Sequence, residues 1–256
     1  MNGAPNIEAV ILAAGLGIRL RNNDDDPPKF AVKVSDEHLV AYPIKMLASV
    51  GVKKFTVVVF EDYADEIREI LDGLDGIKYK LIKNGYPEKG NGYSFLLTDG
   101  HVGSDNFFVS MCDSLYPRRI PLKLLEKFKK SGADVVVGAD SYPLYIDVDE
   151  ATKIKVDGNG NVVRIGKNLV DFNFVDVGLF VVNKKLYQLK SQLLKREVVE
   201  FSDVINKAIE NNLRVVVADI TGTPWTEIDT FYDLSEVLDG RRKIVLDMLL
   251  RELRYS

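Results

Sequence analysis

Two glycines and two basic side chains follow the first apolar segment of the chain. Residues 9–13 (AVILA) are apolar and the run stops at small residues, a pattern typical of a buried strand. Gly15 and Gly17 allow positive φ and let the main chain approach a ligand closely. Arg19 and Lys29 add fixed positive charge. Backbone N–H groups and cations at the end of a strand suit a phosphate chain.

Two familiar phosphate-binding motifs do not fit this loop. The dinucleotide fingerprint needs a third glycine, and Leu20 stands at that position. No lysine follows in P-loop spacing either. A plain turn with solvated charges remains the simplest alternative, but it leaves the spacing of the glycines and cations unexplained. We therefore expect a phosphate-binding loop of another kind.

Composition limits the function classes. The 256 residues are 46% hydrophobic and 28% charged, as in ordinary globular proteins, and no stretch approaches the ~20 apolar residues of a membrane span. The N-terminus lacks a signal-peptide pattern, and one cysteine, Cys112, excludes an internal disulfide, so a cytoplasmic location is expected. A net charge of −4 argues against nucleic acid as a partner. Any anion must meet a local cluster, and Arg19, Arg21, Lys29 and Lys33 are expected to form one.

Alternating patterns predict an α/β fold, a Rossmann-like, mostly parallel sheet flanked by helices. A DGNGN turn between two short strands adds a small β-hairpin lobe. No linker or repeat is visible, so we expect a single domain over residues 1–256. The predicted strands are 9–13, 55–60, 78–82, 107–110, 134–138, 152–156, 162–165, 175–182 and 214–217. The predicted helices are 38–50, 63–71, 93–97, 122–130, 201–210 and, mainly, 230–254.

Three segments carry a resemblance to a known family. LAAGLGIRL followed by PPK resembles the N-terminal signature of sugar-phosphate nucleotidyltransferases. SMCDSLY supplies an aspartate, Asp113, at a strand end, and WTEIDTFYDL supplies a second, Asp229. The chain departs from the family after Leu20, where Arg21 and a run ending in Asp24-Asp25-Asp26 replace the usual proline and threonine; we expect a solvated loop there.

Further segments resemble one branch of this family, the CTP:inositol-1-phosphate cytidylyltransferases. These are PEKGNGYSFL, DEATKIKVDGNGNVVRIGKNL and FVDVGLF, the last with Val177 in place of a common threonine. The resemblance implies transfer of a cytidylyl group from CTP to inositol 1-phosphate or a similar polyol or sugar phosphate, with Mg²⁺ as cofactor. Another acceptor, such as phosphocholine or a sugar 1-phosphate, or another nucleotide such as UTP, remains an alternative.

The resemblance also implies roles for individual residues. Arg19 would neutralise the leaving phosphates, Lys29 would lie at the α-phosphate, and Asp113 and Asp229 would hold Mg²⁺. Lys167 would meet the acceptor phosphate, and Asp176 would accept hydrogen bonds from its ring hydroxyls. The residues expected at the nucleotide are Leu12, Ala13, Ala14, Gly15, Gly17, Gly90, Asn91 and Ser94.

Simpler roles compete with these assignments. An aspartate at a strand end is often a turn or cap residue, and Lys167 or Asp176 could be merely solvated. Cys112 has no histidine partner in its sequence context and is expected to be a small buried residue. His38 and His101 show no metal-ligand spacing.

Two further predictions concern the C-terminal segment and the alternative classes of function. The amphipathic C-terminal segment is expected to pack on its own domain rather than on a membrane or second subunit. A non-catalytic nucleotide sensor should have lost Lys29 or an aspartate, and an oxidoreductase needs the missing third glycine.

Overall fold

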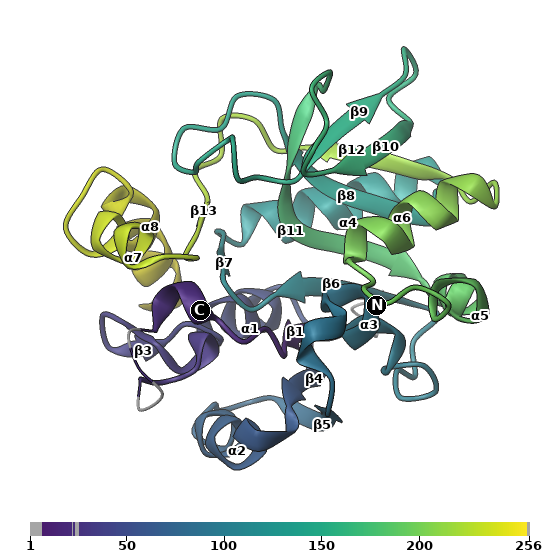
Figure 1. Ribbon diagram of the computed structural model, residues 1–256. Helices are drawn as coiled ribbons and strands as arrows, with labels where there is room; N and C mark the ends of the chain where they lie inside the picture. Colours follow the sequence, from purple (N-terminus) through teal and green to yellow (C-terminus); the bar gives the residue numbers. More distant parts are fainter. Residues whose placement is uncertain (1–6, 22, 24–25, 255–256) are drawn as a thin grey trace, which may run out of the picture.

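A nine-stranded sheet runs through the centre of the computed structural model, which describes residues 7–21, 23 and 26–254 (Figure 1). Its longest path of paired strands is β10-β9-β11-β6-β1-β4-β5, and β8 pairs with both β11 and β12. Strands β6, β1, β4 and β5 are parallel neighbours, whereas β11 runs antiparallel to β6 and β8. The predicted α/β fold, a mostly parallel sheet flanked by helices, is confirmed.

The elements have the following bounds. The strands are β1 (Glu8–Ala13), β2 (Lys33–Val34), β3 (Glu37–His38), β4 (Lys54–Phe60), β5 (Lys78–Asn84), β6 (Asn106–Met111), β7 (Ser114–Leu115), β8 (Val135–Asp140), β9 (Lys153–Val156), β10 (Val162–Gly166), β11 (Phe174–Asn183), β12 (Val215–Asp219) and β13 (Thr226–Glu227). The α-helices are α1 (Ala41–Ser49), α2 (Ala64–Asp72), α3 (Asn91–Leu96), α4 (Arg119–Ser131), α5 (Lys190–Leu193), α6 (Phe201–Glu210), α7 (Phe231–Leu238) and α8 (Lys243–Arg254). Short 3₁₀ turns are η1 (Ile18–Leu20), η2 (Lys29–Ala31), η3 (Glu61–Tyr63), η4 (Pro87–Lys89) and η5 (Lys184–Leu189).

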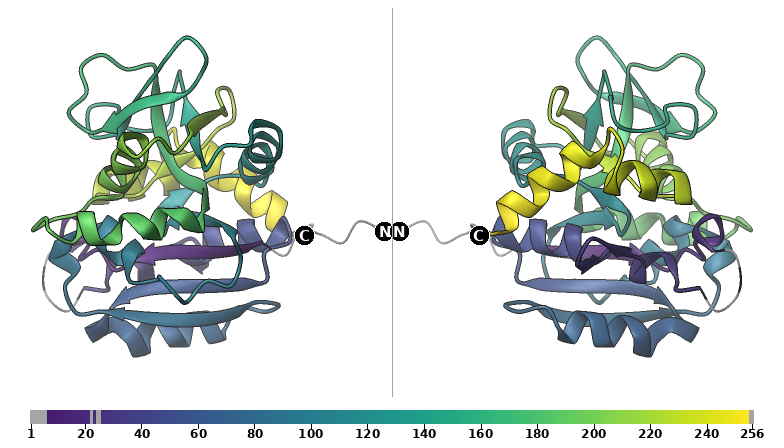
Figure 2. Two further views of the ribbon diagram at one scale, coloured as in Figure 1. Left: turned by 90° about the vertical axis from the view of Figure 1, so that its right-hand side faces the viewer. Right: turned by 90° about the vertical axis from the view of Figure 1, so that its left-hand side faces the viewer.

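Alternate side chains of the central strands belong to two different apolar layers, one on each face of the sheet. Ile11 of β1 belongs to the layer that holds the apolar sides of α1, α2, α4, α7 and α8, while Val10 and Leu12 belong to the layer beneath α3, α5 and α6. The two side views show helices on both faces of the sheet (Figure 2). This is the period of two that a strand buried on both faces requires, and it explains the unbroken apolar runs in the sequence.

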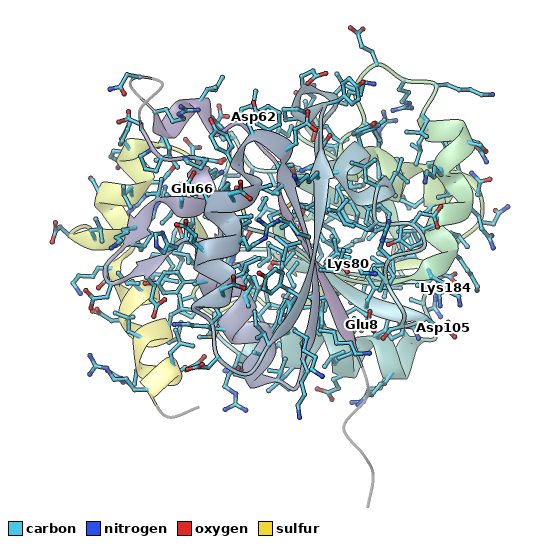
Figure 3. All side chains as sticks on the ribbon, turned by 90° about the horizontal axis from the view of Figure 1, so that it is seen from below. Glu8, Asp62, Glu66, Lys80, Asp105 and Lys184 are labelled. Carbon is cyan, nitrogen blue, oxygen red and sulfur yellow. The ribbon has the colours of Figure 1, made fainter. Side chains whose placement is uncertain are left out.

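Lysines protect the free edge of the sheet. Figure 3 views the molecule from the β5 side, with Lys80 on that strand, Asp62 and Glu66 toward one end of the sheet, and Glu8 toward the other. Lys78, Lys80 and Lys83 are exposed along β5, which discourages pairing with another chain. Glu8 begins β1 at the amino end of the parallel strands, so the opposite end is the carboxyl edge, where ligands of such sheets bind.

The structure corrects two helix predictions. The predicted helix 38–50 begins only at Ala41, because Glu37–His38 pairs as β3 with β2. The predicted helix 230–254 is two helices, α7 and α8, interrupted at residues 239–242. Arg242 in the break is buried and donates from Nη1 to Asp233 Oδ1 (2.6 Å).

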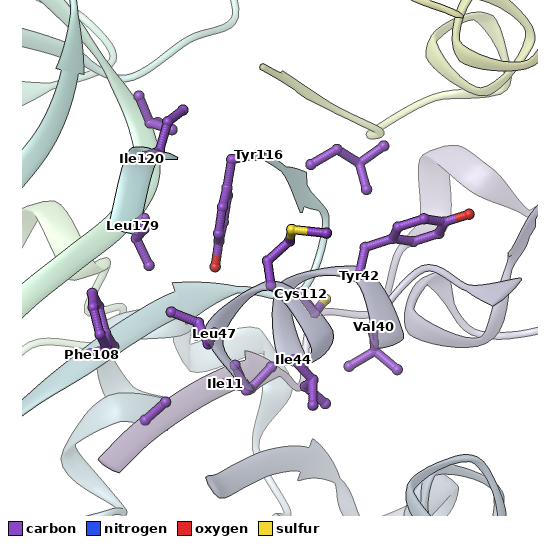
Figure 4. Packing of buried hydrophobic residues seen from close by; sticks show 14 of the residues in the cluster. Ile11, Val40, Tyr42, Ile44, Leu47, Phe108, Cys112, Tyr116, Ile120 and Leu179 are labelled. Carbon is purple, nitrogen blue, oxygen red and sulfur yellow. The ribbon is translucent and has the colours of Figure 1, made fainter. Parts of the chain in front are cut away.

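The C-terminal helix packs on its own fold. Val245, Leu246 and Leu249 of α8 are buried in the layer shared with α1, which confirms the packing prediction. Cys112 is also buried, in the cluster with Tyr42 and Tyr116, as predicted (Figure 4). No helix within residues 7–21, 23 and 26–254 combines the length and the apolar character that a membrane crossing demands.

Candidate functional site

The loop after β1 is shaped by Gly17. Its φ of +61° lies in the left-handed region, and a Cβ there would come within 2.5 Å of Lys29 Cβ. Only glycine therefore lets turns η1 and η2 lie against each other. Gly15 has no neighbouring heavy atom within 4 Å of a hypothetical Cβ, so the loop there faces open space. Arg19 and Lys29, ten residues apart, thus reach one side of the carboxyl edge.

Lys29 lies between the two predicted aspartates. Its Nζ donates to Asp113 Oδ2 and to Asp229 Oδ1, and only 9% of the residue is exposed. Asp113 lies two residues after the end of β6, at the carboxyl edge. The structure therefore brings together three residues that are 84 and 200 positions apart in the chain.

A short strand pair carries Asp229 to Asp113. Strands β7 and β13 run antiparallel with Glu227 opposite Ser114, and Ile228 N donates to Asp113 O (3.2 Å). Trp225, the residue before β13, donates from Nε1 to Asp140 Oδ2 (2.8 Å) and so anchors the start of the segment that carries Asp229. Sequence reasoning missed both strands because two-residue strands carry no periodicity.

The cap of α7 is built by other residues than Asp229. Thr230 is the N-cap, and Asp233 Oδ2 accepts from the main-chain N–H of Asp229 (3.1 Å) and of Thr230 (2.9 Å). Asp233 is held in turn by the buried Arg242. The alternative of a capping role for Asp229 is therefore removed, and its carboxylate is free to face Lys29.

The charges of this cluster reinforce each other. Burial by itself lowers the pKa of Lys29, but the negative charges of Asp113 and Asp229 outweigh it and raise that pKa above its ordinary value. Burial favours the neutral form of Asp229, yet Lys29 and then Arg19 lower its pKa. Lys29 and Asp229 are therefore both charged at neutral pH.

Glu227 is a carboxylate that sequence reasoning missed. It is partly buried, and burial, followed by the charges of Asp229 and Asp113, raises its pKa to about 8. A signal was present in the sequence: Glu227 and Asp229 are two residues apart in an extended segment, so their side chains point the same way. The site holds three carboxyl groups rather than the predicted two.

The carboxylates suit a hard divalent ion held together with phosphate. Among the residues that the structure describes, no three histidine, cysteine or acidic side chains gather closely enough to enclose a metal alone. Mg²⁺ with a nucleotide usually takes only one or two carboxylates, and phosphate oxygens and water complete its shell. Asp113 and Asp229 converge on a single ammonium group, so they lie close enough together to share an ion.

Arg19 bridges two segments, and the predicted four-residue basic cluster does not form. Arg19 Nη2 donates to Asp229 Oδ2 (3.1 Å) and Nη1 to Glu150 Oε2 (3.3 Å). Arg21 Nη1 instead donates to Tyr63 Oη (2.7 Å), and Lys33 is exposed on β2. The prediction was wrong because residues near in sequence leave the loop in different directions.

The predicted acceptor residues lie on adjacent strands. Lys167 is exposed and follows β10, and its charge contributes to lowering the pKa of Asp229 after those of Lys29 and Arg19. Asp176 lies at an irregularity of β11, where Oδ1 accepts from Gly178 N (2.8 Å). Burial nevertheless raises the pKa of Asp176 to about 7.

The Gly90–Ser94 segment is packed through its main chain. A Cβ on Gly90 (φ +88°) would lie 2.6 Å from Val199 O. Asn91 Oδ1 accepts from Phe201 N (2.7 Å), and the buried Ser94 Oγ accepts from Asn84 Nδ2 (3.0 Å). These contacts fix the segment against Asn84 at the end of β5 and against the start of α6.

The remaining candidates divide into buried and surface positions. Leu12, Ala13 and Ala14 are buried at the end of β1, so only their main chain could meet a nucleotide. Burial raises the pKa of the Cys112 thiol, which does not suit a nucleophile. His38 Nδ1 contacts Ala31 O (2.7 Å), and His101 is exposed. Of the aspartate run, positions 24 and 25 lie outside the described residues.

Comparison with known proteins identifies relatives that match along most of the chain. The model of the MobA-like NTP transferase domain matches residues 9–154. The "bifunctional IPC transferase and DIPP synthase" of Archaeoglobus fulgidus is 36% identical over 228 residues, which are 89% of this chain and 42% of that protein. The protein of the same name from Thermococcus kodakarensis is 34% identical over 93% of this chain and 50% of its own length. The chain thus spans about half the length of these curated relatives.

Solved structures extend the comparison. The inositol-1-phosphate CTP transferase from T. maritima superposes with a TM-score of 0.87 at 33% identity, over 97% of this chain and 98% of that one. A glucose-1-phosphate thymidylyltransferase of Bacillus anthracis, described as putative, reaches a TM-score of 0.78 at 16% identity, which supports the fold alone.

Proposed function

Because this chain belongs to the MobA-like NTP transferase family, we propose that it transfers a cytidylyl group from CTP to inositol 1-phosphate, releasing CDP-inositol and pyrophosphate. The names of relatives that match along nearly its whole length support this choice of substrates. A cytoplasmic location and a single domain over residues 1–256 belong to the same proposal. The free thiol of Cys112 suits a reducing compartment.

The observation that carries the proposal is the meeting of Lys29, Asp113 and Asp229 beside the glycine loop. A phosphate oxygen of the acceptor attacks the α-phosphorus of CTP, a new P–O bond forms, and the bond to the β-phosphate oxygen breaks. The attacking oxygen is already anionic at neutral pH, so no general base is required. The chain must position two anions and neutralise the charge that develops.

Each residue then has one task. The main-chain N–H groups from Ala14 to Gly17 bind the triphosphate, and Arg19 exchanges its carboxylate partners for the leaving phosphates. Lys29 neutralises the reacting phosphate. Lys167 binds the acceptor phosphate, and Asp176 accepts hydrogen bonds from ring hydroxyls.

Mg²⁺ is proposed as the cofactor, held by Asp113 and Asp229 with Glu227 beside them. A bound divalent ion would supply charge neutralisation to the phosphates. Lys29 lowers the pKa of Asp229 and so favours its ionised form, which is the state that binds a cation.

The proposed preference for CTP rests on the main chain of residues 90–92. Cytosine carries an exocyclic amine where uracil carries a carbonyl, so carbonyl acceptors pair with one base and repel the other. A buried polar group left unpaired costs about 1–3 kcal/mol, which is roughly ten- to a hundred-fold in kcat/KM. The side chain of Asn91 holds this segment against α6.

The test is pyrophosphate release from a panel of nucleotides and acceptor phosphates. We expect CTP with inositol 1-phosphate to give the highest kcat/KM, and CTP to exceed UTP by roughly ten-fold or more. Equal use of CTP and UTP would remove the cytidylyl assignment. Preference for phosphocholine or a sugar 1-phosphate would change the assignment of the acceptor and leave the assignment of the nucleotide in place. Binding of CTP without turnover would indicate a sensor.

A further inference from the structure

A second buried lysine lies on the acceptor side of the sheet. Lys153, the first residue of β9, is only 8% exposed. It is opposite Gly166 of β10 on one side and Val175 of β11 on the other. Each of these residues immediately precedes a predicted acceptor residue, Lys167 or Asp176, so Lys153 lies between the two strands that carry the acceptor site.

The ammonium group of Lys153 joins two loops. Nζ donates to Lys167 O (3.0 Å) and to Asp149 O (2.9 Å). It also lies 5.9 Å from the ring centroid of Phe172, at the far end of the loop that begins with Lys167. One buried cation therefore fixes the peptide group of Lys167 and the turn that presents Glu150 to Arg19.

The charge of Lys153 lacks an acidic partner among the described residues. Within the part of the chain that the structure describes, no carboxylate lies within 4.0 Å of its Nζ. A buried charge without a partner is costly, and main-chain carbonyls compensate only part of that cost. Lys29, buried to the same degree, has two carboxylates. The geometry thus places, among the described residues, an ammonium group without a carboxylate partner beside the main chain of Lys167.

We propose that Lys153 is a positioning residue for acceptor binding, which rests on the proposed function. Its two hydrogen bonds hold the main chain of Lys167 so that the Lys167 ammonium group meets the acceptor phosphate, and its unpaired charge favours an anion at that place. A methionine of similar length and shape would keep the packing and lose both effects.

The experiment is a double-mutant cycle read by steady-state kinetics. Lys153→Met, Lys167→Met and the double variant are assayed with CTP and inositol 1-phosphate, each varied in turn. Lys155→Met is the matched control, because Lys155 lies on the same strand and pairs with the exposed Asp171 on the same loop (2.6 Å). Lys153→Arg keeps the charge and the donors.

The expected results separate positioning from simple stability. Lys153→Met should raise the KM for inositol 1-phosphate about ten-fold while the KM for CTP changes less than about two-fold. In Lys153→Arg most of that rise in KM should be absent. In Lys155→Met the KM values for both substrates should stay within about two-fold of the wild-type values. In the Lys167→Met background, Lys153→Met should add only about two- to three-fold, because the positioning of Lys167 no longer counts there and only the charge of Lys153 still acts.

Three outcomes would overturn the proposal. These are an unchanged acceptor KM in Lys153→Met, equal rises in both KM values together with a lower melting temperature, and full additivity in the cycle. If Lys153→Met does not fold, Lys153→Gln carries the same comparison. A wild-type protein that makes no CDP-inositol would refute the proposed function separately, and the cycle would then use the acceptor phosphate that the panel identifies.

Discussion

Two regions of the carboxyl edge each contain a buried lysine, and they balance its charge differently. In the transfer cluster, defined as Arg19, Lys29, Asp113, Glu227 and Asp229, Lys29 is paired with two carboxylates. In the acceptor cluster, defined as Lys153, Lys167 and Asp176, the buried lysine donates to two main-chain carbonyls and pairs with no carboxylate of the described residues. The two are 9% and 8% exposed, so burial does not distinguish them.

The difference indicates which ligand each region receives. In the transfer cluster two cations face three carboxyl groups, so an arriving nucleotide must exchange partners with ions that are already paired. In the acceptor cluster the only carboxyl group, Asp176, has a pKa raised by burial to about 7 and carries little charge below that pH. A bare phosphate is therefore better placed in the acceptor cluster, and a metal-bound triphosphate in the transfer cluster.

Asp113→Asn should have the largest effect. The amide keeps the shape of the side chain but removes one of the two charges around Lys29, and with it the proposed metal ligand. We expect kcat to fall by about 10³-fold or more while CTP still binds, measured by single-turnover assay and calorimetric titration. Asp171→Asn, which changes an exposed carboxylate on the loop between β10 and β11, is the control and should keep the wild-type rate. A normal rate in Asp113→Asn would rule out the metal assignment.

Lys29→Ala should lower kcat about 10²-fold with little change in the KM for CTP, because the charge that it neutralises grows in the transition state. Its removal also leaves neighbouring carboxylates without a counter-ion. Without divalent ions the variant should therefore melt at a lower temperature, and Mg²⁺ should raise its melting temperature more than that of the wild type. A change in KM alone would place Lys29 away from the reacting phosphorus.

The transfer cluster was largely predictable from sequence, because its predicted residues stand in short segments with recognisable patterns. Gly17, Arg19 and Lys29 were marked by the loop that carries them, whereas Asp113 and Asp229 were assigned through the motifs of the family resemblance. The convergence of Asp113 and Asp229 depends on β7 and β13, two strands too short for periodicity to mark. Glu227 was missed for the same reason.

The acceptor cluster was predictable only through the family resemblance. Lys167 and Asp176 were assigned by motif, and Lys153 was not singled out, although it stands in the same DEATKIKV segment. Its role depends on strand register, with Gly166 and Val175 as its neighbours, and composition does not encode register. The boundary between α7 and α8 was missed because the buried Arg242 looks like a surface residue in sequence.

Asp176→Asn should change the pH dependence of stability. The pKa of Asp176 rises from 3.8 to about 7 on folding, so its contribution to stability is complete below about pH 4 and is lost as the pH rises through 7. The variant cannot titrate there, and its melting temperature relative to wild type should increase between pH 5 and pH 8. The expected gain is on the order of 1–2 kcal/mol after solvent screening. If the melting temperatures of the variant and the wild type changed in parallel with pH in ligand-free buffer, Asp176 would not titrate in that range.

Glu150→Gln should have the smallest effect, and it tests whether the two regions are coupled. Glu150 lies on the turn that Lys153 holds, and it contacts Arg19 of the transfer cluster. Both side chains are about half exposed, so the ion pair contributes only about 0–1 kcal/mol. Releasing Arg19 should lower the KM for CTP by no more than about two-fold with kcat unchanged, and the difference should vanish near 1 M salt. Glu126→Gln, which breaks a similar exposed pair on α4, should leave both constants alone. A ten-fold rise in KM would instead mean that Glu150 itself contacts the nucleotide or its metal, and the transfer cluster would then include a residue from the acceptor side.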